Sequence, residues 1–323
     1  MSLGKSSGLI LFFSSVGFIS GAAAEVCKLQ RFASIPVTLG SRDAILVDVS
    51  IDGEPVKLQL DTGAGLSLLD QAFVDRRKLP SIEGGAAYGL TGKAVRRSTR
   101  VGQLALGNAV ARDAVFQVVD LRGGDGTDGR PVGLLGADFL ASHDVEIDLA
   151  AARVNLFAPN RCQGQVVYWA KEYFRVPIRQ IPGDLIDVEM QIEGHGLHGL
   201  IDTGASVTTM RLAVARGVFD LSPGSAEPQA HYWMQGVDGR RIDCFDHRFE
   251  SLTLGGITVH DTMVAVADID TRQGAITTGS RITGDPDQPD VIIGMPLLRR
   301  LHLYIAYAER SLYFTVAEPS TAH

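Results

Sequence analysis

The sequence of 323 residues has no surplus of basic charge, because 37 acidic residues outnumber 30 basic ones and leave a formal net charge of −7. Without a basic run, a nucleic acid is not expected as a partner. The sequence also lacks the Gly-x-Ser-x-Gly turn that presents a nucleophilic serine in many hydrolases. It contains no Cys-x-x-Cys pair and no spaced histidine cluster, so neither a metal nor another cofactor is predicted.

Apolar runs long enough to span a membrane are missing as well. The best candidate, 9–19, has about 11 residues, whereas a transmembrane helix needs roughly 20. Lys5 precedes this run, and Ala22-Ala23-Ala24 resembles a cleavage site before Glu25, which predicts a secretory signal peptide over 1–24. An uncleaved anchor is the alternative. We expect an exported protein, periplasmic or secreted, with no stable membrane anchor after cleavage.

Cysteine is scarce, since only Cys27, Cys162 and Cys244 are present. In an oxidising compartment two of the three can form a disulfide and the third is left over. Cys27 and Cys162 each precede one half of the repeat described next, so they are the favoured pair. Three unpaired thiols are the alternative.

What the sequence does have is one motif twice. Asp61-Thr62-Gly63-Ala64 follows the apolar alternation of 56–60, and Asp202-Thr203-Gly204-Ala205 follows that of 197–201. Each motif places a carboxylate at the end of a predicted strand, directly before a tight glycine turn. Two carboxylates that share a site and a proton can activate water against an amide.

The repetition extends well beyond these motifs. At an offset of 141 residues Pro36 aligns with Pro177, and at 158 the apolar-apolar-Gly motif ending in Gly136 aligns with that ending in Gly294. The larger offset places the extra residues of the second half in loops. Alternating apolar residues around Asp-Gly or Glu-Gly predict a hairpin in each half. These hairpins are expected over 45–51 with 56–60, and over 186–192 with 197–201. Short helices are expected near 70–79, 137–142, 209–216 and 295–301.

The two halves predict two lobes related by a pseudo-two-fold axis. We expect an N-terminal lobe over 25–157, an interlobe linker over 158–172 and a C-terminal lobe over 173–318. Both lobes should be rich in β-strands.

With these motifs in this order, the chain resembles the bilobal aspartic proteases over nearly all of 31–315. The alanine after each Asp-Thr-Gly and the short spacing from Asp61 to Gly136 are more similar to the retropepsin type of lobe than to pepsin. The resemblance implies an all-β fold of two retropepsin/pepsin-like lobes with a few short helices. It also implies an origin among exported bacterial proteins of this kind.

The resemblance assigns roles by position. Asp61 and Asp202 would be the catalytic dyad, while Thr62 and Thr203 would exchange hydrogen bonds across the axis. Gly63 and Gly204 would form the tight turns. Behind the two loops, Gly136 and Gly294 would allow a second strand to pass closely.

The resemblance also implies glycine-rich flaps. Tyr88, Gly89 and Gly92 resemble a flap tip, and Gly236 and Gly239 occupy the matching place in the second lobe. Whether one flap or both close over a substrate stays open.

The function implied is that of an aspartic endopeptidase, which hydrolyses a polypeptide with a water molecule activated between Asp61 and Asp202. One chain supplies both halves, so a monomer should be active. An exported peptide-binding module with the same fold and no activity is the alternative. Because Ala64 and Ala205 offer no hydroxyl to an ionised carboxylate, we expect a mildly acid to near-neutral working range.

Three further features of the sequence each allow two interpretations. His195 and His198 could form a metal pair or be exposed turn residues. The Cys244 thiol could line the cleft or lie inside a strand. The Arg96-Arg97 and Arg240-Arg241 pairs could favour acidic substrates or form a solvated strand face.

Overall fold

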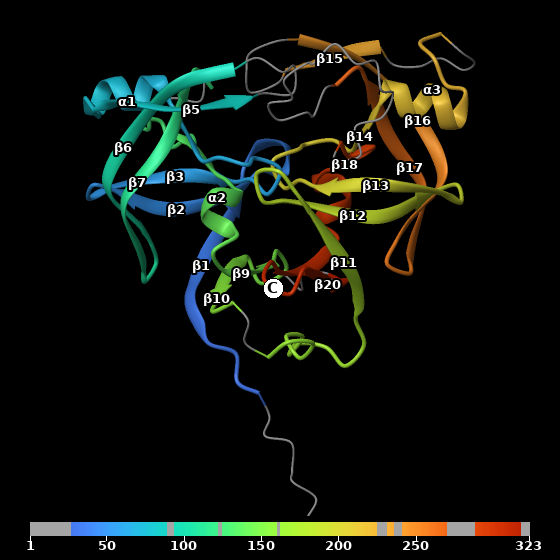
Figure 1. Cartoon of the computed structure of the whole chain (residues 1–323), viewed down its shortest axis with the longest axis horizontal. Helices are drawn as coiled ribbons and strands as arrows, with labels where there is room; N and C mark the ends of the chain where they lie inside the picture. Colours follow the sequence, from blue (N-terminus) through green and yellow to red (C-terminus); the bar gives the residue numbers. More distant parts are fainter. Residues whose placement is uncertain are drawn as a thin grey trace, which may run out of the picture.

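In the computed structural model the chain forms two β-rich lobes side by side above a shared sheet (Figure 1). The structure describes residues 27–88, 94–121, 125–159, 162–224, 231–235, 241–269 and 288–317. The predicted signal peptide, 1–24, lies outside these residues. Within them, no helix is long and apolar enough to cross a membrane.

The two lobes repeat one order of elements. The N-terminal lobe comprises β1 (Arg31–Leu39), a 3-10 turn (Ser41–Asp43), β2 (Ile45–Ile51), β3 (Glu54–Leu60), β4 (Leu68–Asp70), α1 (Gln71–Arg77), β5 (Ser81–Tyr88), β6 (Ala94–Leu106), β7 (Ala109–Val119), β8 (Gly133–Leu135), α2 (Ala137–Leu140), β9 (Asp144–Asp148) and β10 (Arg153–Phe157). The C-terminal lobe comprises β11 (Phe174–Ile181), β12 (Leu185–Ile192), β13 (His195–Ile201), β14 (Thr209–Arg211), α3 (Leu212–Phe219), β15 (His231–Gln235), β16 (Arg241–Leu254), β17 (Ile257–Ala267), β18 (Val291–Ile293), α4 (Met295–Leu298), β19 (Leu301–Ala306) and β20 (Ser311–Val316). The predicted all-β, two-lobe fold with a few short helices is thereby confirmed.

Both predicted hairpins are present. Asp52 and Gly53 join β2 to β3 with φ angles of 47° and 82°, and Glu193 and Gly194 join β12 to β13 with 48° and 80°. Positive φ at both residues is the conformation whose twist matches paired strands, and glycine adopts it without strain. Each hairpin therefore delivers its second strand directly to an Asp-Thr-Gly motif.

One predicted helix begins later than expected. The second lobe was expected to form a helix over 209–216, but Thr209–Arg211 is the strand β14 and the helix α3 is Leu212–Phe219. Strand β14 pairs with β17 on one side and β18 on the other. This double pairing keeps Thr209–Arg211 extended, although the helix α3 follows directly.

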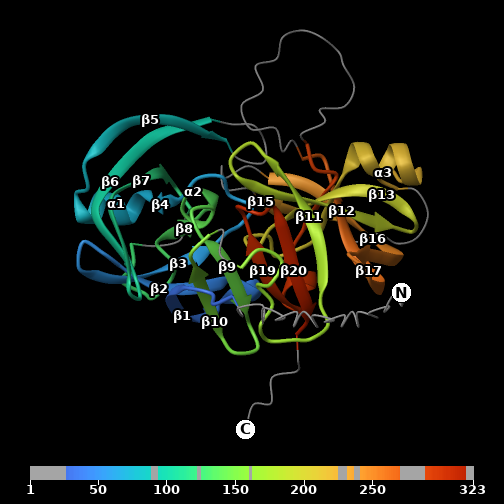
Figure 2. The ribbon, with the colours of Figure 1, turned by 60° about the horizontal axis from the view of Figure 1, so that its bottom comes forward.

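A six-stranded sheet joins the lobes. Its order is β1, β10, β9, β19, β20 and β11, and β9 pairs with β19 across the interlobe boundary. Figure 2 shows these strands side by side. Strands β1 and β11 each leave this sheet for their own lobe immediately after Pro36 and Pro177. A proline cannot donate to a ladder, so it fits the point where a strand changes partner.

Residues after β10 cover one face of this sheet. Trp169 stacks on His302 with ring centroids 4.1 Å apart, and the Tyr168 hydroxyl donates to the buried Glu146 at 2.8 Å. Cys162 forms a disulfide with Cys27, as favoured from the sequence. This disulfide joins the segment before β1 to the segment after β10.

Candidate active site

The two Asp-Thr-Gly-Ala motifs begin the loops 61–67 and 202–208, at the ends of β3 and β13. The backbone amide of Asp61 donates to the carbonyl of Leu135 in β8 at 3.0 Å, and that of Asp202 donates to Ile293 in β18 at the same distance. Strand β8 lies parallel to β3 and antiparallel to β4, so it passes beneath the loop that joins them. Strand β18 does the same in the second lobe.

Thr62 and Thr203 join the two loops. Each threonine hydroxyl accepts a hydrogen bond from the other's amide at 3.1 Å. The Thr62 hydroxyl donates to the Ile201 carbonyl at 2.7 Å, and that of Thr203 donates to Leu60 at 2.9 Å. Both threonines are almost fully buried. All four bonds cross between the lobes, so the two loops are held as one rigid unit.

Gly63 and Gly204 each lie against the carboxyl group of the opposite lobe. A Cβ atom built on Gly63 would lie 2.2 Å from Cγ of Asp202, and one built on Gly204 would lie 2.3 Å from Cγ of Asp61. Real Cβ atoms do not approach other atoms so closely. Glycine is therefore required because it lets the carboxyl group of each lobe lie against the loop of the other lobe.

The carboxyl groups of Asp61 and Asp202 lie next to each other, each against the glycine of the opposite loop, and they interact through charge and hydrogen bonding. Burial, then the charge of Asp202 and the bond to it, hold the pKa of Asp61 well above its usual range. Burial also raises the pKa of Asp202, but the amides of Gly204 and Ala205 and the bond from Asp61 oppose that rise. The pair is thus arranged to hold one proton between two carboxyl groups.

Gly136 and Gly294 lie where the second strand of each lobe passes the loop. A Cβ on Gly136 would meet the Ala64 carbonyl oxygen at 2.7 Å, and one on Gly294 would meet that of Val207 at 2.4 Å. The residues after these glycines, Ala137 and Met295, also donate backbone hydrogen bonds to the loops. The missing side chains are what permits this close contact.

Several supporting residues were not predicted as site residues. The Ser67 hydroxyl accepts from the Gly136 amide at 3.0 Å and donates to Asp138 at 2.6 Å, so Asp138 braces the first loop. Thr208 takes the place of Ser67 in the second lobe and accepts from Gly294. The repeat places Ser67 and Thr208 at the same offset of 141 residues, which is the signal that could have identified them.

Apolar clusters adjoin both loops. Ala64 packs against a cluster that contains Leu68, Val119 and Leu134. Ala205 packs against a larger cluster of buried side chains, most of them from strands of the C-terminal lobe, comprising Ala137, Ile181, Leu185, Leu200, Ile242, Cys244, Ala267, Ile269 and Ile292. Apolar side chains therefore pack beside both loops, and the cluster beside Ala205 is the larger.

Most flap candidates lie outside the described residues. Tyr88 is the last residue of β5, while Gly89, Gly92, Gly236 and Gly239 are not among the described residues. In the second lobe, Trp233 of β15 is about half exposed.

The arginine pairs are accounted for by local contacts where they are described. The Arg241 guanidinium lies 4.0 Å from the Trp233 ring centroid, a cation–π contact. Arg97 pairs with Asp75 at 2.8 Å.

The two histidines of β13 have separate partners. His195 packs edge-on against Phe219, and Nδ1 of His198 lies 3.0 Å from the buried Asp187 carboxylate. Within the described parts of the chain, no group of three or more His, Cys, Asp and Glu is arranged to hold a metal. Cys244 is buried in β16, where its thiol contacts the Tyr232 carbonyl at 3.4 Å, which matches the strand-interior alternative.

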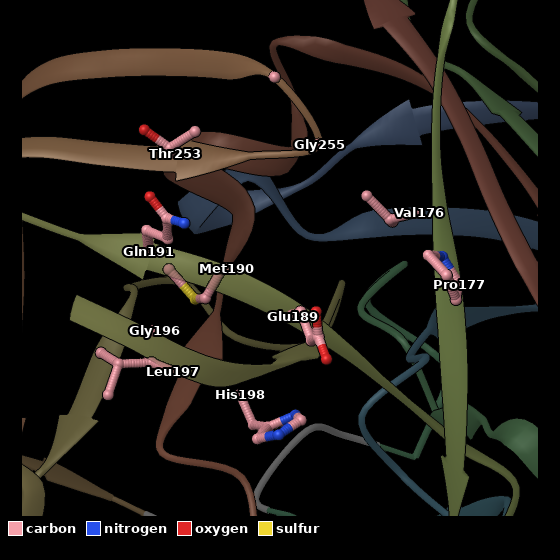
Figure 3. Close-up of a pocket in the computed structure, with 11 residues that line it drawn as sticks. Val176, Pro177, Glu189, Met190, Gln191, Gly196, Leu197, His198, Thr253 and Gly255 are labelled. Carbon is pink, nitrogen blue, oxygen red and sulfur yellow. The ribbon is translucent and has the colours of Figure 1, made fainter. Parts of the chain in front are cut away.

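A cavity of about 510 Å³ lies on the C-terminal lobe, apart from the dyad. Its walls come from β11, β12, β13 and the turn after β16, and include Glu189, Met190, Leu197 and His198 (Figure 3). None of its lining residues belongs to the loops 61–67 or 202–208.

Comparison with known proteins agrees with this geometry. A search of curated proteins finds no match. A family model described as aspartyl protease matches the chain twice, over residues 47–139 and 188–297. Each match contains one Asp-Thr-Gly loop and the glycine behind it, and together the matches cover more than half of the sequence. The chain therefore belongs to the aspartyl protease family, as a bilobal member with one family segment in each lobe.

Proposed function

We propose that this protein is an aspartic endopeptidase and that Asp61 and Asp202 are its catalytic pair. The observation that carries the proposal is the mutual arrangement of the two motifs, in which each glycine makes room for the opposite carboxyl group. A fold that had lost its activity would not need two buried carboxyl groups next to each other, because their burial raises both pKa values and costs free energy.

The proposed reaction uses water as the nucleophile. The ionised carboxylate accepts a proton from a water molecule, whose oxygen attacks the carbonyl carbon of the peptide bond. The protonated carboxyl group donates its proton to the carbonyl oxygen as the tetrahedral intermediate forms. The intermediate then collapses and the C–N bond breaks: the carboxyl group that took a proton from water gives it to the leaving amine, and the other carboxylate takes a proton back from a hydroxyl group of the intermediate. No covalent bond to the protein forms at any stage.

The substrate is proposed to be a polypeptide with apolar residues next to the cleaved bond. The apolar clusters beside Ala64 and Ala205 support this, because an apolar side chain buried there would leave water. We also propose that the protein is exported and acts as a monomer. The Cys27–Cys162 disulfide supports an oxidising compartment.

Cleavage of a peptide library, followed by mass spectrometry from pH 3 to 7, tests the activity. We expect Asp61→Asn and Asp202→Asn to lower kcat/KM by at least about 10²-fold, the lower end for loss of an acid or base. Asp113→Asn is the matched control, since Asp113 is exposed and far along β7 from the loops. Pepstatin should inhibit the wild type.

Two other outcomes would each overturn the proposal. If Asp61→Asn cleaves as well as the wild type, the pair is not catalytic. If no form cleaves any peptide but peptides still bind, the protein is a binding module with the same fold.

A further inference from the structure

The two halves of the site differ at one position next to the dyad. Gln59 in β3 and Leu200 in β13 are equivalent at the offset of 141 residues, and each stands two residues before its aspartate. The Gln59 carboxamide is half-buried and donates to the Gly204 carbonyl of the other lobe at 3.4 Å. Leu200 is buried in the apolar cluster beside Ala205, and its hydrocarbon side chain cannot donate. Only one of the two loops is therefore held in this way from across the axis.

The held carbonyl belongs to the peptide group that also contains the Ala205 amide. In a trans peptide the C=O and the following N–H point in opposite directions. The Gly204 oxygen faces Gln59, so the Ala205 N–H points to the other side. There it donates to Oδ1 of Asp202 at 3.1 Å.

The two aspartates consequently receive unequal support. Oδ1 of Asp202 accepts from the amides of both Gly204, at 2.8 Å, and Ala205. Oδ1 of Asp61 accepts from the Gly63 amide at the longer distance of 3.0 Å, and the Ala64 amide donates to the backbone carbonyl of Asp61 at 3.4 Å. Backbone donors favour the ionised form of a carboxyl group.

We infer that Gln59 is a positioning residue that polarises the dyad. By orienting the Gly204–Ala205 peptide, it makes Asp202 the ionised member and leaves the shared proton on Asp61. If the proposed function holds, Asp202 is the base that accepts the proton of water and Asp61 is the acid. Among the described residues, the only titratable groups that shift the pKa values of the pair are the two carboxyl groups themselves. The nearby Asp138 carboxylate accepts hydrogen bonds from the amide and hydroxyl of Ser67.

A titration of the dyad by carbon-13 NMR tests this inference without requiring cleavage. The protein is labelled at the aspartate carboxyl carbons, and the two signals are assigned with Asp61→Asn and Asp202→Asn. In the wild type the lower titration step should belong to Asp202. In Gln59→Met, which keeps the length of the side chain but removes the donor, the lower pKa should rise by about 0.5 to 1 unit, as expected for weakening one bond to a charged group.

A neighbouring substitution provides the control. Lys57 lies two residues earlier in β3 and pairs with Asp48 at 2.5 Å, away from both loops. Lys57→Gln should leave the dyad titration unchanged. If Gln59→Met does not fold, Gln59→Leu replaces it, because leucine is the residue found at the equivalent position of the other lobe.

The inference is wrong if Gln59→Met titrates as the wild type does, or if Asp61 carries the lower step. A parallel measurement of kcat/KM against pH should show the acidic limb moving with the lower pKa. A wild type that cleaves nothing would overturn the proposed function, whereas the NMR titration would still decide the role of Gln59.

Discussion

The hydroxyl groups of Thr62 and Thr203 accept hydrogen bonds from each other's backbone amides, at 3.1 Å in both directions. Each hydroxyl then donates to a strand carbonyl of the opposite lobe. The threonines thus hold the position of the aspartates that precede them.

Thr62→Val should therefore destabilise the protein as well as impair it. The substitution leaves the Thr203 amide and the Ile201 carbonyl without their partner in a buried place, at a cost of roughly 1–3 kcal/mol for each group. Thr62→Ser keeps the hydroxyl, and its free energy of unfolding should stay close to that of the wild type.

Urea denaturation measures the difference in the free energy of unfolding between these variants. Thr258→Val, on an exposed strand position, should change the free energy of unfolding by less than about 0.5 kcal/mol. Equal stability of Thr62→Val and Thr62→Ser would contradict this account.

Gly63→Ala and Gly204→Ala should each abolish activity. The added methyl group would occupy space within 2.5 Å of the opposite carboxyl group, so the two aspartates would have to separate. Cleavage assays and thermal unfolding measure the effect, with Gly196→Ala as control, because a Cβ at Gly196 meets nothing within 4 Å. Retained activity in either variant would mean that the loops can move apart without loss of catalysis.

The alanine after each motif sets the expected pH range. In Ala205→Ser a hydroxyl could donate to the Asp202 carboxylate, which favours the ionised form and lowers its pKa. The acidic limb of kcat/KM should then move to lower pH by about 0.5 to 1 unit, the effect of one hydrogen bond to a charged group. The wild type should work from mildly acid to near-neutral pH. A wild-type profile that peaks below about pH 3 would refute the expectation.

The raised pKa of the buried Asp144 predicts that the free energy of unfolding falls as the pH rises. Burial, then the charge of Glu309, raise the pKa of Asp144 to about 7, against the lowering effect of the Tyr304 hydroxyl. Between about pH 4 and 7 the folded state holds a proton that the unfolded state has released, so stability falls with pH, by at most about 1.4 kcal/mol per unit. The contribution of the protonated Asp144 to stability is fully present below the pKa that this residue has in the unfolded chain, and it is lost as the pH rises through 7.

Urea denaturation of Asp144→Asn at several pH values measures this contribution. The variant should show a flatter dependence of stability on pH than the wild type over this window. Asp113→Asn should keep the wild-type slope, since Asp113 is exposed, and asparagine tolerates its positive φ of 52°. An unchanged slope in Asp144→Asn would assign the dependence to other groups.

Much of each lobe could be predicted because its signals are local. Alternating apolar residues, the Asp52-Gly53 turn and its counterpart in the second half specify hairpins within a few residues. Repetition then placed the two motifs in equivalent surroundings. The start of α3 was predicted three residues too early, because Thr209–Arg211 is kept extended by strands β17 and β18, which are distant in sequence.

Apart from the exchange between Thr62 and Thr203, which the resemblance implied, contacts across the lobes were beyond sequence reasoning. The pairing of β9 with β19 joins segments about 160 residues apart, and nothing in either strand indicates its partner. The bond from Gln59 to Gly204 spans 145 residues, and glutamine at a strand position carries no signal of its own. Burial of Asp144 and Glu146 in the shared sheet also contradicts the usual exposure of acidic residues.

The sheet β1, β10, β9, β19, β20 and β11 has the same order of equivalent strands from either edge, as two identical copies around one axis would have. A homodimer translated from a single short gene must carry the same residue on both sides, so any change is made twice. Covalent fusion removes that restriction, and each half can then mutate independently. Glutamine at position 59 opposite leucine at position 200 is a difference that a homodimer encoded by one such gene could not carry.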